Sequence, residues 1–157
     1  MRNMTEQALT IQISKLPAGA SLEDCFMIRR KVFIEEQDVS EEEEMDGLDD
    51  QADQYLLTVN GNPAATARVR FPDQHKGKVE RVAVLKEFRG LHLGEKLMER
   101  IIEDISVREG IREILLAAQT QVIGFYGKLG FEAFGEEFLD ANIPHYWMTR
   151  PPLGRRK

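Results

Sequence analysis

What the sequence lacks excludes several classes of protein. It has a single cysteine, Cys25, so it forms no internal disulfide and fits a reducing compartment. No apolar run approaches the roughly 18 residues of a membrane span, and the N-terminus lacks the basic flank and apolar core of a signal peptide. Positive charge is in deficit, since the formal net charge is −6, which disfavours non-specific binding to nucleic acid. We therefore expect a cytoplasmic protein with neither a membrane nor a nucleic-acid partner.

The chain also lacks the internal repeats and low-complexity linkers that would divide it into separate units. At 157 residues it is long enough to bury roughly 70% of the surface of the unfolded chain in one core. We predict a single domain over residues 1–157, with its core from about residue 9 to about residue 150.

The first part of the chain predicts a strand, a helix and an acidic loop. Residues 9–14 alternate as a strand does. Ser21 is a candidate helix N-cap with Asp24 in capping-box position, and apolar residues then recur at helical spacing to about residue 35. The run Glu41–Glu44 is interpreted as a solvated loop.

The rest of the pattern predicts a sheet with one parallel pair. Asn60-Gly61 between two apolar runs is a strong hairpin signal. A strand over residues 78–85, an amphipathic helix from Leu93 that stops at Gly110, and a strand over 114–118 imply a right-handed parallel crossover. The unbroken apolar run 114–118 is typical of a strand buried on both faces. The other predicted elements are strands at 55–59, 64–71, 132–138 and 145–150 and a short helix at 122–128.

The loop before the long helix carries two glycines, Gly90 and Gly94. A helix N-terminus presents unpaired N–H groups and the positive end of the macrodipole, which together suit phosphate. The P-loop is excluded because Glu95 follows Gly94 where that motif needs lysine, and the dinucleotide fingerprint needs a third glycine. The loop therefore predicts a phosphate-bearing cofactor bound in another way.

With its pattern R-x-x-x-x-G, this loop resembles motif A of the GNAT superfamily of N-acetyltransferases, whose usual form is [RQ]-x-x-G-x-[GA]. Arg89 and Gly94 match, whereas His92 stands where the family usually has its first glycine. If the backbone there needs a positive φ, histidine carries strain that glycine would not. In that family the loop holds the pyrophosphate of acetyl-CoA, the acetyl donor. The resemblance implies that the cofactor is bound by Arg89, Gly90, Leu91, His92, Leu93 and Gly94.

A second segment, from Phe125 to Phe131, resembles the F-Y-x-x-x-G-F motif of the same family. Gln119 stands where the family often has asparagine, and its amide can still hydrogen-bond the pantetheine arm. The resemblance implies that Tyr126 assists the departing coenzyme A. A phenol has a pKa near 10 and a thiol near 8.5, so full proton donation is uphill by about 2 kcal/mol. We expect Tyr126 chiefly to hydrogen-bond the developing thiolate.

Three further segments, residues 29–39, 80–84 and 143–148, resemble the ElaA/YjcF-like GNAT proteins, so the resemblance runs from about residue 10 to about residue 149. It implies the GNAT fold, of class α/β (α+β): a mixed, mostly antiparallel sheet flanked by helices, in which two parallel strands splay apart around the pantetheine. Here those strands end near Val84 and Ala118, and Val82, Ala83 and Val84 would lie along the cofactor.

Acetyl transfer to an amine needs a base, because an ordinary alkyl amine has a pKa near 10.4. Glu80 is the first candidate, since on a regular strand it shares a face with Val82 and Val84 and leads towards the thioester; a surface ion pair is the alternative role. His145 is the second, because imidazole exchanges protons near neutral pH, although a structural role stays open. A backbone N–H near Ala83–Val84 would polarise the thioester carbonyl. Direct transfer leaves Cys25 a buried thiol with no catalytic part.

The acceptor is predicted to be a small-molecule or peptide amine, and no metal is required. Candidate acceptor-site residues are Arg30, Phe33, Glu36, Gln37 and His145, with packing and loop capping as alternative roles for those of the first helix. The acceptor's identity and the oligomeric state, a homodimer included, stay open at this point.

Two rival functions also remain. The acyl-homoserine-lactone synthases share the GNAT fold and an R…F…E…D…D theme, which Arg30, Phe33, Glu43, Asp46 and Asp49 follow faintly. The chain is short for that group and keeps the acetyltransferase tyrosine motif. The other rival is a non-catalytic module, in which His92 and the lack of an acceptor site leave only the binding of acyl-CoA.

Overall fold

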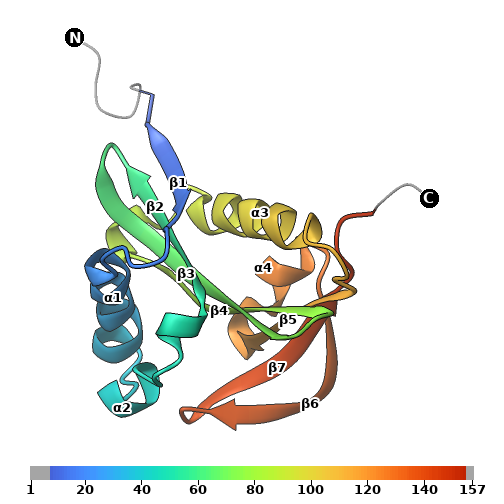
Figure 1. Ribbon diagram of the computed structural model, residues 1–157. Coiled ribbons are helices and arrows are strands. Elements are labelled where there is room, and N and C mark those ends of the chain that lie inside the picture. Colours follow the sequence, from blue (N-terminus) through green and yellow to red (C-terminus); the bar gives the residue numbers. More distant parts are fainter. Residues whose placement is uncertain (1–7, 155–157) are drawn as a thin grey trace.

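The computed structural model describes residues 8–154, which form one seven-stranded sheet in the order β1-β2-β3-β4-β5-β7-β6 (Figure 1). Every neighbouring pair is antiparallel except β4 and β5, which are parallel. This is the predicted mixed, mostly antiparallel sheet. The strands are β1 (Ile11–Lys15), β2 (Asp53–Val59), β3 (Asn62–Asp73), β4 (Lys76–Val84), β5 (Glu113–Gln119), β6 (Glu132–Asp140) and β7 (Ile143–Arg150).

Helices cover both faces of the sheet, with α1 and α2 on one side and α3 and α4 on the other (Figure 1). None of the helices in the described part of the chain is long and apolar enough to cross a membrane. The α-helices are α1 (Glu23–Arg29), α2 (Glu41–Glu44), α3 (Leu93–Ser106) and α4 (Ile123–Gly127). Shorter segments are the π-helical η2 (Arg30–Glu36) and the 3₁₀ turns η3 (Asp49–Gln51), η4 (Lys86–Phe88) and η5 (Thr120–Val122).

The main core lies between the sheet and α3. The apolar stripe predicted for this helix is buried throughout, and Leu97, Met98 and Ile101 are fully enclosed. Gly77 on β4 allows close approach, because a Cβ there would lie 2.8 Å from Ile105 Cγ2. A second, smaller cluster joins Ile28 and Val32 to β4 on the opposite face.

The predicted hairpin is confirmed. Asn60 and Gly61 have φ values of 51° and 83°, as a two-residue turn that matches strand twist requires. The predicted capping box at the first helix is wrong, because the N-cap residue is Leu22 and the Ser21 hydroxyl accepts only the Glu23 N–H, at 3.3 Å.

The prediction of a solvated acidic loop is also wrong. Residues Glu41–Glu44 form the helix α2, and the Ser40 hydroxyl caps it by accepting the Glu43 N–H at 3.1 Å. Glu44 is only 2% exposed. Ion pairs with arginines on α1 and β4 offset the cost of burying this carboxylate. Neither arginine is near Glu44 in the sequence, so local patterns do not predict these pairs.

The two parallel strands diverge as predicted. They pair only from Lys76 opposite Glu113 to Val79 opposite Leu116. Beyond that point β5 continues to pair with β7, as far as Gln119 opposite His145. Since β4 runs on to Val84 with no strand of residues 8–154 beside it on this edge, a gap opens between the strands.

A β-bulge in β4 changes which residues face the gap. Thr66 pairs with Ala83 but Arg68 pairs with Glu80, so β4 has one residue more than β3 there, and Arg81 takes a left-handed φ of 57°. The bulge reverses the alternation of side chains. Glu80 therefore lies on the opposite face from Val82 and Val84, which pack against the main core, and the predicted shared face is wrong.

The strand β5 is not buried on both faces, which corrects another expectation. Ile114, Leu116 and Ala118 are buried, whereas Leu115 and Ala117 on the other face are only partly covered. Ala117 borders the gap, so residues of the apolar run line a cleft as well as the core.

Candidate active site

A cleft of about 1320 Å³ occupies the gap between β4 and β5 and extends across the sheet edge to η2, α4 and the β6–β7 turn. It is large for a small-molecule site and has room for an extended ligand with an acceptor beside it. Most of the predicted site residues line it: Phe33, Glu36, Gln37, Glu80, Val82, Ala83, Val84, Arg89, Gly90, His92, Leu93, Gly94, Gln119, Tyr126 and His145.

Two predicted site residues do not line the cleft. Leu91 is 39% exposed at the tip of the loop before α3. Arg30 points to the surface, where its guanidinium pairs with the Glu41 carboxylate. No group of three or more His, Cys, Asp or Glu within residues 8–154 is arranged to hold a metal ion.

One end of the cleft is formed by the first turn of α3. His92 is its N-cap and has φ 60° and ψ 28°, so the position does require the left-handed conformation that glycine adopts without strain. The His92 side chain is 79% exposed, which leaves the turn itself open to the cleft. Gly94 permits close packing, since a Cβ there would lie 3.2 Å from Phe125 Cζ. The unpaired N–H groups of this turn therefore face a space that an anion can enter.

Arg89, beside this turn, is held by two partners. Its guanidinium donates two hydrogen bonds to the Glu36 carboxylate, at 2.6 and 2.9 Å, and its Nε donates to the Val84 carbonyl at 3.0 Å. The hydrogen bond from Arg89 lowers the pKa of Glu36. The pair joins the α3 end of the cleft to η2 on the opposite side of the sheet.

Tyr126 lines the cleft from α4. It is 8% exposed and packs edge-to-face on Phe125 and Phe131, with ring centroids 4.9 and 6.1 Å away. Burial raises the pKa of the Tyr126 phenol, so the hydroxyl stays protonated at neutral pH. It has no hydrogen-bond partner within residues 8–154, which leaves it available to donate to a ligand.

Gln119 belongs to a chain of amides at the end of β5. It donates to Gln37 Oε1 at 2.8 Å and accepts from Gln121 Nε2 at 2.7 Å. These bonds fix the side chain of Gln119 across the mouth of the gap between the strands.

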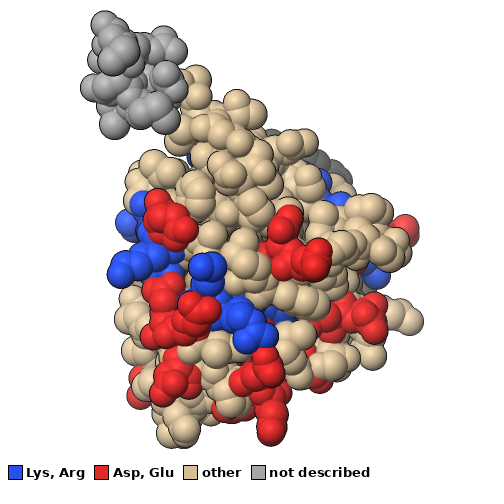
Figure 2. All heavy atoms as spheres, turned by 90° about the vertical axis from the view of Figure 1, so that its left-hand side faces the viewer, with Lys and Arg blue, Asp and Glu red and all other residues tan. Residues whose placement is uncertain are grey.

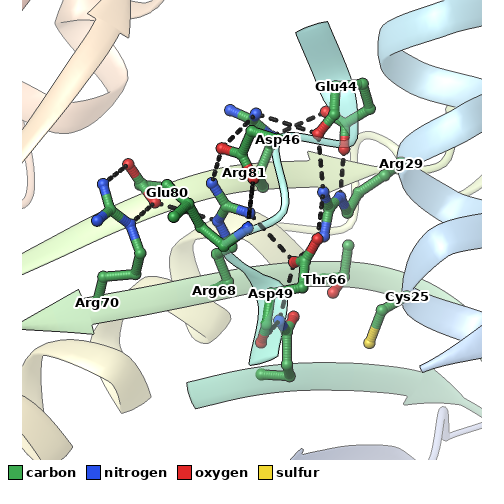
Figure 3. Close-up of polar contacts among 12 residues, drawn as sticks. Cys25, Arg29, Glu44, Asp46, Asp49, Thr66, Arg68, Arg70, Glu80 and Arg81 are labelled. Carbon is green, nitrogen blue, oxygen red and sulfur yellow. Dashed lines mark hydrogen bonds and ion pairs between the residues drawn. The ribbon is translucent and has the colours of Figure 1, made fainter. Parts of the chain in front are cut away.

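Glu80 lies among cations. Arg70 donates to it twice, at 2.7 and 2.9 Å, and Arg68 donates at 3.1 Å (Figure 3). Lys78 Nζ lies 3.0 Å from the Glu80 carboxylate. Burial would raise its pKa, but the hydrogen bonds from Arg70 and Lys78 and the nearby positive charges outweigh this effect and lower the pKa of Glu80 to about 2. A carboxylate so stabilised is a weak proton acceptor.

Arg68 extends this cluster toward α2. It is 1% exposed and lies between Glu80, Asp46 and Asp49 (Figure 3), with Asp46 Oδ2 at 2.6 Å and Asp49 Oδ1 at 3.1 Å. Arg29 on α1 pairs with Asp49 and with the buried Glu44. On this side of the molecule, positive and negative side chains interleave at the surface as well (Figure 2).

Arg81, the left-handed residue of the bulge, ties β4 to α2. Its Nε lies 2.9 Å from Glu44 Oε1, an ion pair without hydrogen-bond alignment, and its terminal nitrogen donates to the carbonyls of Glu43 and Glu44. We define the ion network as the group that links α1, α2, β3 and β4: Arg29, Glu44, Asp46, Asp49, Arg68, Arg70, Lys78, Glu80 and Arg81.

The far wall of the cleft is aromatic. Phe138 on β6 stacks on both His145 and Trp147 of β7, with ring centroids 5.9 and 5.3 Å apart, and Lys78 Nζ lies 5.2 Å from the Trp147 centroid. His145 Nδ1 lies 2.6 Å from the Ile143 carbonyl. A carbonyl can only accept, so Nδ1 carries the proton and the neutral ring keeps a lone pair on Nε2.

A family model described as Acetyltransferase (GNAT) domain matches residues 7–151. The chain belongs to the GNAT acetyltransferase family. It is therefore an acyltransferase, and the resemblance found in its motifs is confirmed. Among GNAT relatives, the Bacillus subtilis protein called Uncharacterized N-acetyltransferase YjcF is 38% identical over 130 residues, covering 82% of this chain and 91% of YjcF.

Solved GNAT-like structures agree with the fold. Escherichia coli ElaA superposes with a TM-score of 0.76 at 25% identity, covering 91% of this chain and 99% of ElaA. An acyl-CoA N-acyltransferase from Pseudomonas aeruginosa superposes with a TM-score of 0.75 at 29% identity, covering 91% and 99% of the two chains.

Several residues of this GNAT cleft were not predicted from the sequence. Phe138 and Trp147 could have been noticed as aromatics on two neighbouring predicted strands, although nothing local says which face they occupy. The partners of Glu80 could not have been found, because Arg68 and Arg70 meet it only through the strand register, and the bulge that sets its face carries no glycine.

Proposed function

We propose that the protein transfers the acetyl group of acetyl-CoA to a primary amine of a small molecule or peptide, by direct attack within a ternary complex. The observation that supports this proposal is that the buried Tyr126 lines the same cleft as the open first turn of α3 and the diverging strands β4 and β5. Bound acetyl-CoA supplies an activated acyl group, and the residues of the cleft supply the rest.

Three features of the cleft fit such a ligand. The N–H groups that open α3 suit the diphosphate, and Lys128 is an exposed cation on the cleft wall with no ion-pair partner among residues 8–154. The unpaired edge of β4 past Val79 suits the amides of a pantetheine arm, as an added strand would pair there. The Gln119 amide lies where that arm would leave the sheet.

The chemistry follows from the groups around the thioester. A backbone N–H of the Ala83–Val84 segment polarises the carbonyl while the amine nitrogen attacks its carbon. As the carbon–sulfur bond breaks, Tyr126 donates a hydrogen bond to the thiolate, because its own proton is held tightly. No covalent intermediate on the protein is needed, and Cys25 is fully buried away from the cleft.

We assign removal of the amine proton to His145 in preference to Glu80. The Nδ1 bond to Ile143 leaves Nε2 as the accepting atom, and stacking on Phe138 fixes the ring. Glu80, with its pKa of about 2, instead contributes a fixed negative charge near the acceptor amine. Phe33, Gln37 and the aromatic wall would shape the acceptor half.

The test is coenzyme A release, detected with a thiol reagent, across a panel of amines with wild type and Tyr126→Phe. We expect turnover on at least one amine and a fall in kcat of about tenfold or more for Tyr126→Phe. Tyr146→Phe is the matched control, since Tyr146 on β7 carries the same phenol side chain but does not line the cleft. Acetyl-CoA binding with no turnover on any amine would favour a binding module instead.

The lactone-synthase alternative is tested with S-adenosylmethionine and acyl carriers. Asp46 and Asp49, the two aspartates of that theme, are already engaged by Arg68 and Arg29. We therefore expect no reaction in that assay.

A further inference from the structure

Arg89 and Glu36 lie in different parts of the proposed site. Arg89 precedes the first turn of α3, where the diphosphate is proposed to bind, and Glu36 is the last residue of η2, which borders the acceptor half. Their side chains are 44% and 33% exposed, and the two hydrogen bonds between them have the parallel geometry of a bidentate pair. The contact therefore bridges the two halves of the cleft.

Arg89 also occupies a backbone acceptor on the cleft edge of β4. The N–H of Leu85 points to β3, where it donates to the Ala64 carbonyl at 2.9 Å. Successive residues of a strand point their backbone groups to opposite edges, so the carbonyl of Val84 faces the gap. That carbonyl accepts from Arg89 Nε at 3.0 Å. A pantetheine amide pairing along this edge would meet Arg89 there.

We propose that Glu36 competes with the cofactor's diphosphate for Arg89, so that cofactor binding releases the Glu36 carboxylate into the acceptor half of the cleft. This inference rests on the proposed function. Glu36 then acts as a positioning residue that couples the two halves: acetyl-CoA binds first, and the carboxylate it frees becomes available to a cationic amine. The coupling is weak enough to be reversible, because a half-exposed ion pair contributes little.

The test is calorimetry of coenzyme A binding to wild type, Glu36→Gln and Glu35→Gln, at low ionic strength to limit screening. We expect Glu36→Gln to bind about two- to fivefold more tightly, because the competing carboxylate is gone. Glu35→Gln is the matched control, since Glu35 is the neighbouring residue but lies outside the cleft, and its affinity should equal that of wild type.

A double-mutant cycle shows whether Arg89 carries the effect. In an Arg89→Gln background, the added Glu36→Gln change should no longer tighten binding. The effect should also persist with dephospho-CoA, which retains the diphosphate and lacks the 3′-phosphate. Unchanged affinity in Glu36→Gln, an undiminished gain without Arg89, or a gain lost with dephospho-CoA would each overturn the coupling. Those results leave the proposed function standing, whereas failure of wild type to bind coenzyme A removes it.

Discussion

At the scale of single residues, the first turn of α3 combines a strained backbone with N–H groups that stay accessible. His92 keeps a left-handed φ of 60° that glycine would adopt more easily, yet its side chain turns outward and leaves the turn open. Having histidine where the family usually has glycine therefore costs backbone strain, but the side chain does not block access to the N–H groups of the turn.

Gly94 offers a direct test of the anion site. Any side chain there meets Phe125, so Gly94→Gln and Gly94→Glu share the same crowding and differ only in charge. We expect Gly94→Glu to bind coenzyme A about tenfold more weakly than Gly94→Gln, because it places a negative charge beside the diphosphate. Calorimetry with both variants gives the comparison. Equal affinities in folded proteins would remove this turn from the cofactor site.

His145 is tested by the pH dependence of turnover. If Nε2 accepts the amine proton, His145→Gln should lower kcat/KM by about a hundredfold and abolish the acidic limb of its pH profile. His75→Gln is a suitable control, since His75 bonds the Gly110 carbonyl at the opposite end of β4. A variant of His145 that keeps the wild-type profile would return the base to Glu80, acting through water.

At the scale of elements, the bulge in β4 and the helix α2 depend on each other through Arg81. The residue holds a left-handed φ of 57°, and its side chain supports Glu44 and the end of α2. The bulge in turn sets the register of Ala83 and Val84 against β3. Fixing α2 therefore also fixes the strand edge proposed to bind the thioester.

Two substitutions separate the conformation of Arg81 from its contacts. Arg81→Gly keeps the left-handed backbone and loses the ion pair, and we expect it to lower the free energy of unfolding by about 2 kcal/mol, since Glu44 stays buried. Arg81→Ala should lose about 1 kcal/mol more, because alanine strains that conformation. Denaturant unfolding measures both values. If alanine and glycine were equivalent, the bulge would have no left-handed strain.

At the scale of the whole molecule, the ion network makes stability depend on acid. The pKa of Glu80 is lowered from an ordinary 4.5 to about 2, and those of Asp46 and Asp49 are lowered too. Carboxylates with a depressed folded-state pKa stabilise fully above the unfolded value and lose that contribution as pH falls through the folded one. Glu44, whose pKa burial raises, works in the opposite direction.

We therefore expect the free energy of unfolding to decrease between about pH 4.5 and pH 2, and Glu80→Gln to flatten this decrease. Urea unfolding at a series of pH values checks it. Glu99→Gln is a control, since Glu99 is exposed on α3 and lies outside the ion network. An identical slope in Glu80→Gln and wild type would contradict the network's part in acid stability.

Local features of the fold could be predicted from the sequence, whereas contacts between distant parts of the chain could not. The hairpin at Asn60-Gly61, the apolar face of α3 and the parallel crossover follow from short-range spacing, and all were predicted correctly. The surroundings of Glu80 depend on a bulge and on the register of β3 against β4. The burial of Glu44 depends on arginines that lie far away in the chain. Such contacts are set by tertiary packing, which periodicity does not encode.

The early separation of β4 from β5 has a further consequence. A sheet normally completes its own ladder of main-chain bonds, but here the ladder stops at Val79 opposite Leu116. A pantetheine arm in the gap would take the place of the absent strand-to-strand hydrogen bonds. Its binding energy would then stabilise the two halves of the sheet against separation. While it is bound, the acetyl donor would then help to hold the two halves of the sheet together. The stability of the folded protein would fall each time the product coenzyme A is released.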